Sequence, residues 1–542
     1  MTLIELLRKE SKKPIEKLLL FSALSGIAST GSLALINNAA QNTKTDSINI
    51  SQVVMFLAVL GIFAFSFKYI LIEGINIIED ILNGIRLRIS DKIRRTDLQN
   101  VESIGKATIY NCMTQELSMI SQMSIYLIQA MQSAVLLIFI TIYVAILSKV
   151  AVVLVVVIVT IGFFVLRKKD KIVLAKLQDT NKADIKYFMT ITDILDGLKE
   201  IKLNRKKSSD LFDVYGKISD NVKSLKIDAG HLFAQNIVFS QSFIFLTLGA
   251  IVFVLPQFQG TLSDDVLSTT TAMLFAIGPL GSLISTLPYY EKVNLSVKNI
   301  FNLEKELDMK VNHDEIQPEN DFNCFSGFKK IVIDNLYFEY LKGQKRDSFS
   351  VGPFNLELRR GETVFIIGGN GSGKTTMLKA LTMLYKPNSG SIYVDDKLVD
   401  NTNFHDYREL YSAIFNDFHL FEKLYGVKGI EPEKVSELLK LMKIEGKTDF
   451  CDNGFTEINL STGQRKRLAL IVSILEDKPV YIFDEWAADQ DPTFKDFFYD
   501  KLLKKLKASD KTVIAVSHDD RYFHLADRII KLDYGKLIEG KS

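Results

Sequence analysis

The sequence predicts a six-helix, all-α transmembrane domain fused to a soluble α/β domain. Two observations carry this prediction. Apolar residues crowd into the first half of the 542-residue chain, although 24% of all its residues are charged. In the second half, short apolar runs typical of buried strands alternate with helical stretches. The first half is therefore expected to lie in lipid and the second half in water.

Six stretches are long and apolar enough to cross a bilayer, which takes about 20 residues of helix. The first is diluted by serine, threonine and glycine, small residues that allow close helix packing in lipid. A cleaved signal peptide is the alternative for this first stretch, because basic residues precede it. The predicted spans lie at residues 17–37, 53–73, 124–147, 150–166, 237–258 and 266–288.

Basic residues predict the orientation of these spans. They cluster before the first span, after the second and after the fourth, whereas the opposite loops hold little more than Lys44 and Lys149. By the positive-inside rule the N-terminus is cytoplasmic, and six spans return the chain to the same side. The protein is thus expected to be a multi-pass membrane protein with cytoplasmic N- and C-termini.

The two cytoplasmic connections, residues 74–123 and 167–236, are far longer than ordinary helix–helix loops. They keep helical apolar spacing and contain little proline or glycine, so we expect the membrane helices to continue into the cytoplasm. A polar stretch follows the last span. The predicted domains are a transmembrane domain at 1–305, a linker at 306–330 and the α/β domain at 331–542.

A glycine-rich loop follows the apolar run 364–367 and matches the pattern G-x-x-x-x-G-K-[ST] in the required order of strand, loop and helix. Such a loop turns its backbone N–H groups around phosphates. We expect Lys374 to reach the β- and γ-phosphates of ATP and the Thr375 hydroxyl to bind Mg²⁺. The predicted phosphate-binding residues are Gly368, Gly369, Asn370, Gly371, Ser372, Gly373, Lys374, Thr375 and Thr376.

A second buried run, residues 480–483, ends in two carboxylates, Asp484 and Glu485. Asp484 is expected to hold Mg²⁺, and Glu485 to polarise the water that attacks ATP. An ordinary solvated turn is the alternative for these two residues taken alone. Their place about 110 residues after the phosphate loop favours the catalytic interpretation.

Charge and cysteine content exclude other classes of protein. Lys and Arg number 66 against 64 for Asp and Glu, so no strong positive field exists to bind nucleic acid. The three cysteines, Cys112, Cys324 and Cys451, lie far apart in the sequence. They form neither a disulfide framework nor a zinc motif.

Residues 460–464 read LSTGQ and resemble the LSGGQ signature of the ATP-binding cassette (ABC) family, with Thr462 in place of the first glycine. The resemblance implies ATP hydrolysis coupled to transport. It also implies that Ser461, Gly463 and Gln464 contact the nucleotide of the opposite subunit. A plain helix N-cap is the alternative for Ser461.

Further positions match the family in order. The resemblance implies that Tyr340 stacks on adenine, that His518 touches the γ-phosphate and that Asp491 belongs to the loop crossing the dimer interface. A strand aromatic of the core is the alternative for Tyr340. Asn416 stands where the family usually has Gln, so it contacts Mg²⁺ directly or through water. Glu485, His518 and Lys374 are the implied catalytic residues.

The departures from the common pattern are themselves informative. Residues 483–492 read FDEWAADQDP and residues 460–467 read LSTGQRKR. These motifs resemble bacterial exporters of cyclic peptides and peptide siderophores, of the syringomycin and pyoverdine export type. The resemblance implies a six-helix all-α transmembrane exporter domain fused to an α/β P-loop nucleotide-binding domain in the inner membrane. The implied partners are a second copy of the chain, membrane lipid and a peptide-like substrate.

Three alternatives stay open. A heterodimer would satisfy the need for two chains as well as a homodimer. The cargo could be a lipid or another small hydrophobic molecule, or the protein could be a regulatory ATPase that transports nothing. Polar residues of the predicted spans either line a central cavity or form interhelical hydrogen bonds: Gln129, Gln132, Gln241, Ser282 and Ser285.

Overall fold

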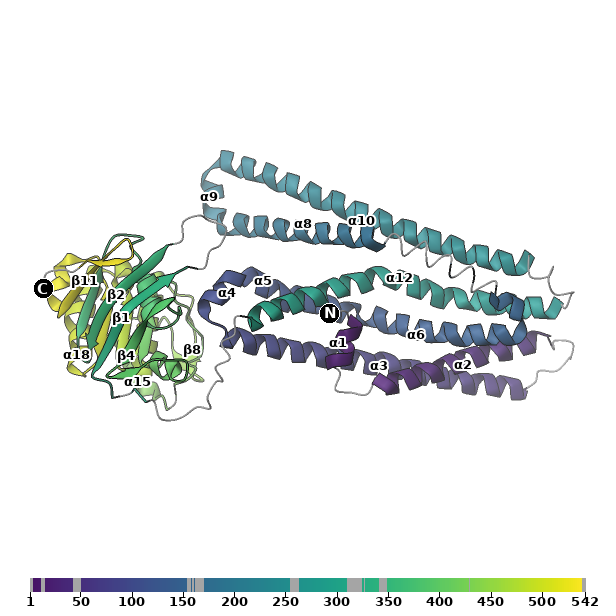
Figure 1. The fold of residues 1–542 in the computed structure, drawn as a ribbon, viewed down its shortest axis with the longest axis horizontal. Helices are drawn as coiled ribbons and strands as arrows, with labels where there is room; N and C mark the ends of the chain where they lie inside the picture. The colour runs from purple at the N-terminus through teal and green to yellow at the C-terminus, as the bar shows by residue number, and fades with distance from the viewer. Residues whose placement is uncertain are drawn as a thin grey trace. The chain divides into compact units, whose positions relative to one another are not determined.

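The chain forms two compact units in the computed structural model (Figure 1). Unit 1 comprises residues 1–94 and 104–309, and unit 2 comprises residues 95–103 and 310–542. The structure describes residues 3–10, 15–41, 50–153, 157, 160, 170–253, 263–309, 324, 325, 327–340, 349–427 and 429–538.

Unit 1 is helical throughout its described residues. Five of its helical segments are long and apolar enough to cross a membrane: Glu16–Ala40, Ile50–Arg95, Lys106–Leu147, Arg205–Ala250 and Leu267–Asp308. Each of them contains or overlaps one predicted span. The remaining predicted span, 150–166, lies mostly outside the described residues, so the count of six stays a prediction. The helices of unit 1 are α1 (Leu3–Glu10), α2 (Ile15–Gln41), α3 (Ile50–Arg95), α5 (Lys106–Asn111), the π-helical turn η1 (Cys112–Glu116), α6 (Leu117–Leu147), α8 (Asp170–Asp196), α9 (Leu198–Leu203), α10 (Arg205–Phe253) and α12 (Ser263–Asp308).

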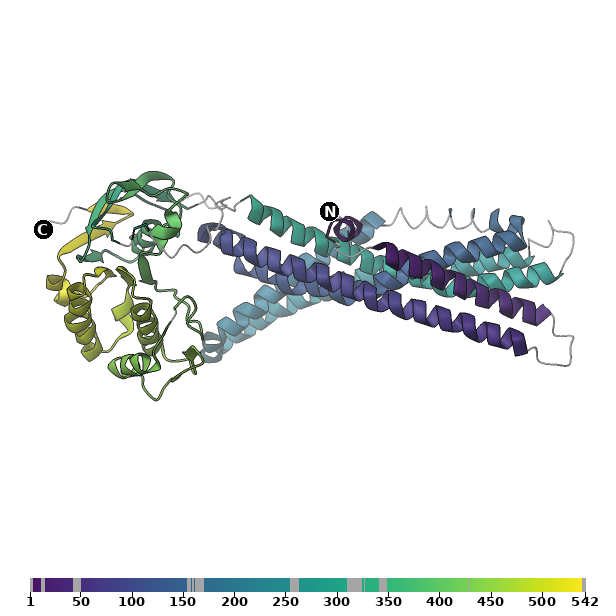
Figure 2. The same ribbon diagram turned by 90° about the horizontal axis from the view of Figure 1, so that it is seen from below.

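Two helices of unit 1 are long enough to continue beyond a bilayer, and their extension into the cytoplasm stays a prediction. Helix α3 has 46 residues and α10 has 49. At about 1.5 Å per residue each is roughly 70 Å long, more than twice the ~30 Å hydrocarbon core of a bilayer. Helices α8 and α10 run side by side in Figures 1 and 2, and the ion pairs Lys176–Asp228 (3.0 Å) and Asp184–Lys226 (2.9 Å) join them.

Apolar side chains of α3, α6 and α12 pack together as one core cluster of unit 1, which includes Ile81, Ile85, Ile120 and Val297. Among the polar candidates, Gln132 on α6 is buried and donates a hydrogen bond from Nε2 to Ser25 Oγ on α2 at 2.8 Å. Gln132 therefore follows the interhelical alternative. In unit 1, Gln241 and Ser285 are exposed, while Gln129 and Ser282 are half-buried.

Unit 2 contains a six-stranded sheet, a four-stranded antiparallel sheet and a two-stranded ribbon in its described residues. The six-stranded sheet has the order β12-β11-β3-β10-β9-β6, and all its pairings are parallel except that of β12 with β11. Its strands are β3 (Thr363–Ile367), β6 (Tyr411–Ile414), β9 (Val480–Asp484), β10 (Thr512–Val516), β11 (Arg528–Asp533) and β12 (Lys536–Ile538).

The apolar runs 364–367 and 480–483, predicted as buried strands, form β3 and β9, and β10 is a third strand of the same kind. They are nearly continuous apolar runs because a parallel sheet is covered on both faces, and nearly all of their residues are buried. The antiparallel sheet consists of β1 (Lys330–Glu339), β2 (Ser350–Arg359), β4 (Ser389–Val394) and β5 (Lys397–Leu398), and the ribbon of β7 (Phe450–Cys451) and β8 (Gly454–Phe455). The helices of unit 2 are α13 (Lys374–Leu381), α14 (Phe404–Arg408), α15 (Pro432–Leu441), α16 (Thr462–Glu476), η2 (Trp486–Asp489), α17 (Pro492–Asp496), η3 (Phe497–Leu503), α18 (Lys504–Ala508) and η4 (Asp520–Leu525).

Residues 95–103, which lie within the predicted first domain, pack as part of unit 2. They include most of helix α4 (Leu98–Ile104). Glu102 accepts a hydrogen bond from the Tyr385 hydroxyl at 2.7 Å, and Asp97 lies 3.7 Å from the Arg408 guanidinium. Burial, aided by the hydrogen bond to Glu102, raises the pKa of Tyr385. The chain segment that leaves α3 is thus held by polar contacts to the α/β fold.

Candidate active site

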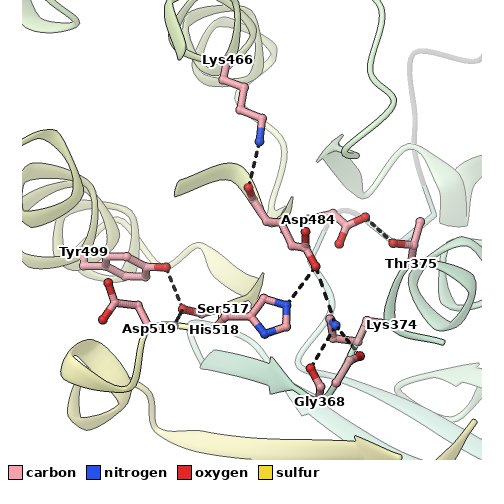
Figure 3. A network of polar contacts seen from close by, with 11 residues as sticks. Gly368, Lys374, Thr375, Lys466, Asp484, Tyr499, Ser517, His518 and Asp519 are labelled. Atoms are coloured by element: carbon pink, nitrogen blue, oxygen red, sulfur yellow. Dashed lines mark hydrogen bonds and ion pairs between the residues drawn. The ribbon is translucent and has the colours of Figure 1, made fainter. Parts of the chain in front are cut away.

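Four parallel strands deliver the candidate site residues to one edge of the six-stranded sheet. The glycine loop follows β3, Glu485 follows β9, His518 follows β10 and Asn416 lies just after β6. The carboxyl ends of parallel strands share one edge, so residues from four separate stretches of sequence meet there. Figure 3 shows these residues close together at the sheet edge: Gly368, Lys374, Thr375, Asp484 and His518.

The loop 368–373 is shaped by close approaches that only glycine allows. Gly373 has φ +99°, the left-handed region, and caps the N-terminus of α13. A Cβ on Gly368 would lie 2.2 Å from the Leu532 carbonyl oxygen. Lys374 is buried and donates from Nζ to the carbonyl oxygens of Gly368 and Gly369, both at 3.1 Å. The loop, its lysine and the start of α13 make a site suited to phosphate.

Asp484 has the environment of a cation ligand. Its Oδ2 accepts a hydrogen bond from the Thr375 hydroxyl at 2.7 Å, whereas its buried Oδ1 has no hydrogen-bond partner among the described residues. Burial raises the pKa of this carboxyl, although the bonds from the Thr375 hydroxyl and the Asn416 backbone N–H oppose the shift. A carboxylate beside a hydroxyl suits Mg²⁺, which is commonly held by one or two carboxylates, water and phosphate oxygens. The residues present therefore fit the metal.

Glu485, His518 and Lys374 lie in direct contact. Glu485 Oε1 is 3.0 Å from His518 Nε2 and 3.7 Å from Lys374 Nζ. Glu485 has φ +51°, an uncommon conformation for a residue with a side chain, and such strain concentrates at functional sites. The structure thus brings together the three residues that the sequence predicted as catalytic.

Tyr340 lies at the end of β1, close to the helix of the phosphate loop. Its hydroxyl is 3.2 Å from Thr376 Oγ1, and its ring meets the rings of Phe338 and Tyr385 edge-on. This position is compatible with both interpretations of Tyr340. Its stacking on adenine stays a prediction.

The signature residues open helix α16. Ser461 is the N-cap, and with Gln464 it forms a capping box in which the Ser461 backbone N–H donates to Gln464 Oε1 at 3.3 Å. The N-cap alternative for Ser461 is therefore correct in the single chain. Contact with a second chain's nucleotide is not excluded by this role and stays a prediction.

Asp491 is the N-cap of α17, where its Oδ1 accepts from the Phe494 backbone N–H at 3.0 Å. Its Oδ2 lies 2.7 Å from Arg467 Nη2 on α16. Hydrogen bonds from the Thr493 hydroxyl and the Phe494 N–H, together with Arg467, lower the pKa of Asp491 to about 2. The loop that contains Asp491 is thereby tied to the signature helix.

Two residues that the sequence did not single out, Lys466 and Asp489, connect the signature helix α16 to the segment that carries Glu485. Lys466 and Asp489 form a pair 2.7 Å apart, and Lys466 also bonds to the backbone of Glu485. The signal was present in the sequence, because Lys466 stands in RKR after the signature and Asp489 is one of the departures from the common cassette pattern. Their contact was not predictable, because 22 intervening residues separate them.

Comparison with known proteins agrees with this geometry. Residues 351–488 match the family model described as ABC transporter. The chain carries an ABC transporter domain. It is 29% identical over 547 aligned residues to the ATP-binding protein SyrD of Pseudomonas syringae pv. syringae, with 96% of this chain and 93% of SyrD covered. The sequence-based resemblance to the ABC family is confirmed.

Other relatives align over a smaller part of the chain. The human mitochondrial iron–sulfur clusters transporter ABCB7 is 26% identical over 380 residues, which cover 67% of this chain and 49% of ABCB7. An ATP-dependent lipid A-core flippase of Idiomarina loihiensis is 25% identical over 374 residues, which cover 65% of this chain and 61% of the flippase.

The fold is that of a solved bacterial Atm1-family ABC exporter with ATP bound. The TM-score is 0.76 at 17% identity, and the match covers 97% of this chain and 93% of that chain. Together with the long apolar helices, these findings indicate a multi-pass membrane protein that carries an ABC transporter ATPase domain.

Proposed function

We propose that the protein uses ATP to export a peptide across the bacterial inner membrane. The cargo is a cyclic or modified peptide or a peptide siderophore, and both termini are cytoplasmic. The proposal is carried by the similarity to SyrD, which extends along nearly the whole chain, and by the two motifs at residues 460–467 and 483–492. SyrD aligns over nearly the whole of both chains, and the motifs around Glu485 and Ser461 are those that resemble peptide exporters.

Hydrolysis is carried by side chains that lie together at the sheet edge. Lys374 binds the β- and γ-phosphates, and the remaining residues of the 368–376 loop surround them. Glu485 orients and polarises the attacking water, and His518, 3.0 Å away, holds the Glu485 carboxylate and faces the γ-phosphate. A positioned base of this kind contributes about 10²- to 10⁴-fold to a rate.

Mg²⁺ would be held by the Thr375 hydroxyl and the Asp484 carboxylate, with the Asn416 amide in reach directly or through water, and would neutralise charge on the phosphates. Tyr340 stacks on the adenine. These roles concern the chain's own half of a nucleotide site.

The other half comes from a second chain. One chain has one phosphate loop and one signature, so two copies build two composite sites. Ser461, Gly463 and Gln464 complete the site of the partner, and Asp491 lies in the loop at the interface between copies. A homodimer is the simplest assembly that meets this need, and a heterodimer is its alternative.

ATP binding closes the dimer, and the helices that extend beyond the bilayer pass this closure to the membrane. Residues 95–103 support this step, because Glu102 and Asp97 bond to the α/β fold directly after the 46-residue helix α3. Closure turns a cavity from inward-facing to outward-facing. Hydrolysis then resets the transporter.

Lipid is the second candidate cargo, because the chain is also similar to a lipid A-core flippase. The test uses purified full-length protein in inside-out vesicles of Escherichia coli polar lipid. A cyclic lipopeptide, a linear peptide of equal charge and lipid A are added separately, and ATPase rate and ATP-dependent uptake are measured. Glu485→Gln protein serves as the control.

We expect the cyclic lipopeptide to raise the ATPase rate. It should accumulate in the vesicles only when ATP is present and Glu485 is unchanged. Stimulation by added lipid A but by neither peptide would contradict the peptide proposal and favour the flippase. A rate that no compound changes, with no uptake, would favour a regulatory ATPase.

A further inference from the structure

A dense set of polar contacts joins the first turns of α16 to the segment 485–491 that follows β9. Gln490 Nε2 donates to the Gly463 carbonyl at 3.0 Å, and Arg467 Nε donates to Gln490 Oε1 at 2.8 Å. A Cβ on Gly463 would lie only 2.9 Å from the Asp489 carbonyl oxygen. The signature helix and the segment carrying Glu485 are thus in close contact.

Lys466 lies at the centre of these contacts. Its side chain is 2% exposed, and Nζ donates to the Glu485 carbonyl oxygen at 2.9 Å and lies 2.7 Å from Asp489 Oδ2. In return, Trp486 Nε1 donates to the Lys466 carbonyl oxygen at 2.8 Å. Figure 3 shows the Lys466 side chain reaching down from its helix to the backbone beside Asp484.

Burying an ammonium group is unfavourable unless hydrogen bonds and an opposite charge replace the lost water. Lys466 has both kinds of partner, and both belong to residues 485–489.

The contact to Glu485 bears on the reaction. Glu485 holds a left-handed backbone conformation with φ +51°, and residues in such conformations persist only where their surroundings hold them. Lys466 fixes the peptide group on the C-terminal side of this residue. The direction of the Glu485 side chain toward His518, 3.0 Å away, follows from that backbone.

We propose that Lys466, paired with Asp489, is a positioning residue that holds the backbone of Glu485 so that its carboxylate faces the attacking water. Lys466 acts through Glu485, so this inference rests on the proposed function. Because Ser461 caps the N-terminus of α16, the same lysine links the end of the helix that meets the partner's nucleotide to the base at the chain's own nucleotide.

The first test is Lys466→Met in full-length purified protein. Methionine keeps an unbranched side chain that ends where the lysine ammonium begins, so the change removes the charge and the donors. Lys504→Met is the matched control, because among the described residues the exposed Lys504 side chain pairs with Asp500 alone, at 3.5 Å. We expect Lys466→Met to lower kcat for ATP about 10- to 100-fold, as a misplaced reactive group does, with KM and measured nucleotide affinity unchanged. The control should keep the full rate.

Folding is checked through Trp486, the one tryptophan in the chain. Its bond goes to the Lys466 backbone, which the substitution retains, so its emission should be unchanged. Should Lys466→Met not fold, Asp489→Asn removes only the acceptor charge and is expected to lower kcat in the same direction by a smaller factor. Unchanged kcat in the folded variants would overturn the inference.

A double-mutant cycle separates positioning from general stabilisation. If Lys466 acts through Glu485, Lys466→Met has little further effect on the residual rate of Glu485→Gln. Multiplying effects would overturn the positioning role while leaving Glu485 as the base. If Glu485→Gln alone turns over at the normal rate, the catalytic role proposed for Glu485 fails, whatever Lys466→Met does.

Discussion

Glu485→Gln tests the assignment of the catalytic base with a minimal change of shape. The substitution replaces one carboxylate oxygen by an amide NH₂ and leaves the volume and backbone as they are. In the unmodified protein, Glu485 Oε1 lies 3.0 Å from His518 Nε2 and 3.7 Å from Lys374 Nζ. The variant therefore loses the base and one negative charge, and little else.

The expected size of the effect on kcat follows from the role. Loss of a positioned general base lowers a rate by about 10²- to 10⁴-fold, which corresponds to roughly 3–5 kcal/mol of barrier.

The effect of Glu485→Gln on ATP binding has another source. Two unit charges at 3.7 Å attract by about 4.5 kcal/mol at an effective dielectric of 20, before screening by solvent, so the Glu485 charge competes with ATP for Lys374. Its removal should leave ATP affinity equal or higher.

The assay measures phosphate release in a single turnover and, separately, binding of a fluorescent ATP analogue. Glu409→Gln is the control, because within the described part of the chain the exposed Glu409 carboxylate pairs with Lys478 alone, at 3.9 Å. We expect the Glu485 variant to bind ATP, to release phosphate at least 10²-fold more slowly and to accumulate as a closed ATP-bound dimer. Turnover near the normal rate in folded Glu485→Gln would refute the role of Glu485.

Three further changes have defined outcomes. Lys374→Ala removes the cation from the phosphate loop, so ATP affinity and export should both collapse; equal affinity in a titration would contradict the placement of the site. In a tandem of two fused chains, Lys374→Ala in one half and Ser461→Arg in the other leave one composite site intact and should retain partial ATPase activity. Both changes in the same half damage both sites and should abolish activity; tandems that behave alike would exclude composite sites. Asp491→Ala removes the N-cap of α17 and should lower the free energy of unfolding by about 1 kcal/mol. Since the pKa of Asp491 is lowered from 3.8 to about 2, its contribution is present above pH 3.8 and is lost as the pH falls toward 2, so the difference between variant and parent should vanish in acid.

Local patterns determined most of the membrane-spanning helices and the chemistry of the nucleotide site. A stretch of about 20 apolar residues has few alternatives to a membrane helix, because an unpaired backbone is unfavourable in lipid. The phosphate loop 368–376 is likewise local, since its strand, glycines, Lys374 and helix are consecutive. The resemblance of residues 460–467 and 483–492 to ABC exporters supplied the remaining roles without any knowledge of contacts.

Contacts between distant segments were decided only by the tertiary structure. The parallel order β3-β10-β9 brings His518 to within 3.0 Å of Glu485, although the two residues end separate strands. Residues 95–103 were assigned by sequence to the membrane domain, yet Glu102 bonds to Tyr385 of the α/β fold. No sequence pattern singled out Lys466. Its burial against Glu485 and Asp489 depends on the packing of α16 on the segment after β9, and no pattern within either segment contains that information.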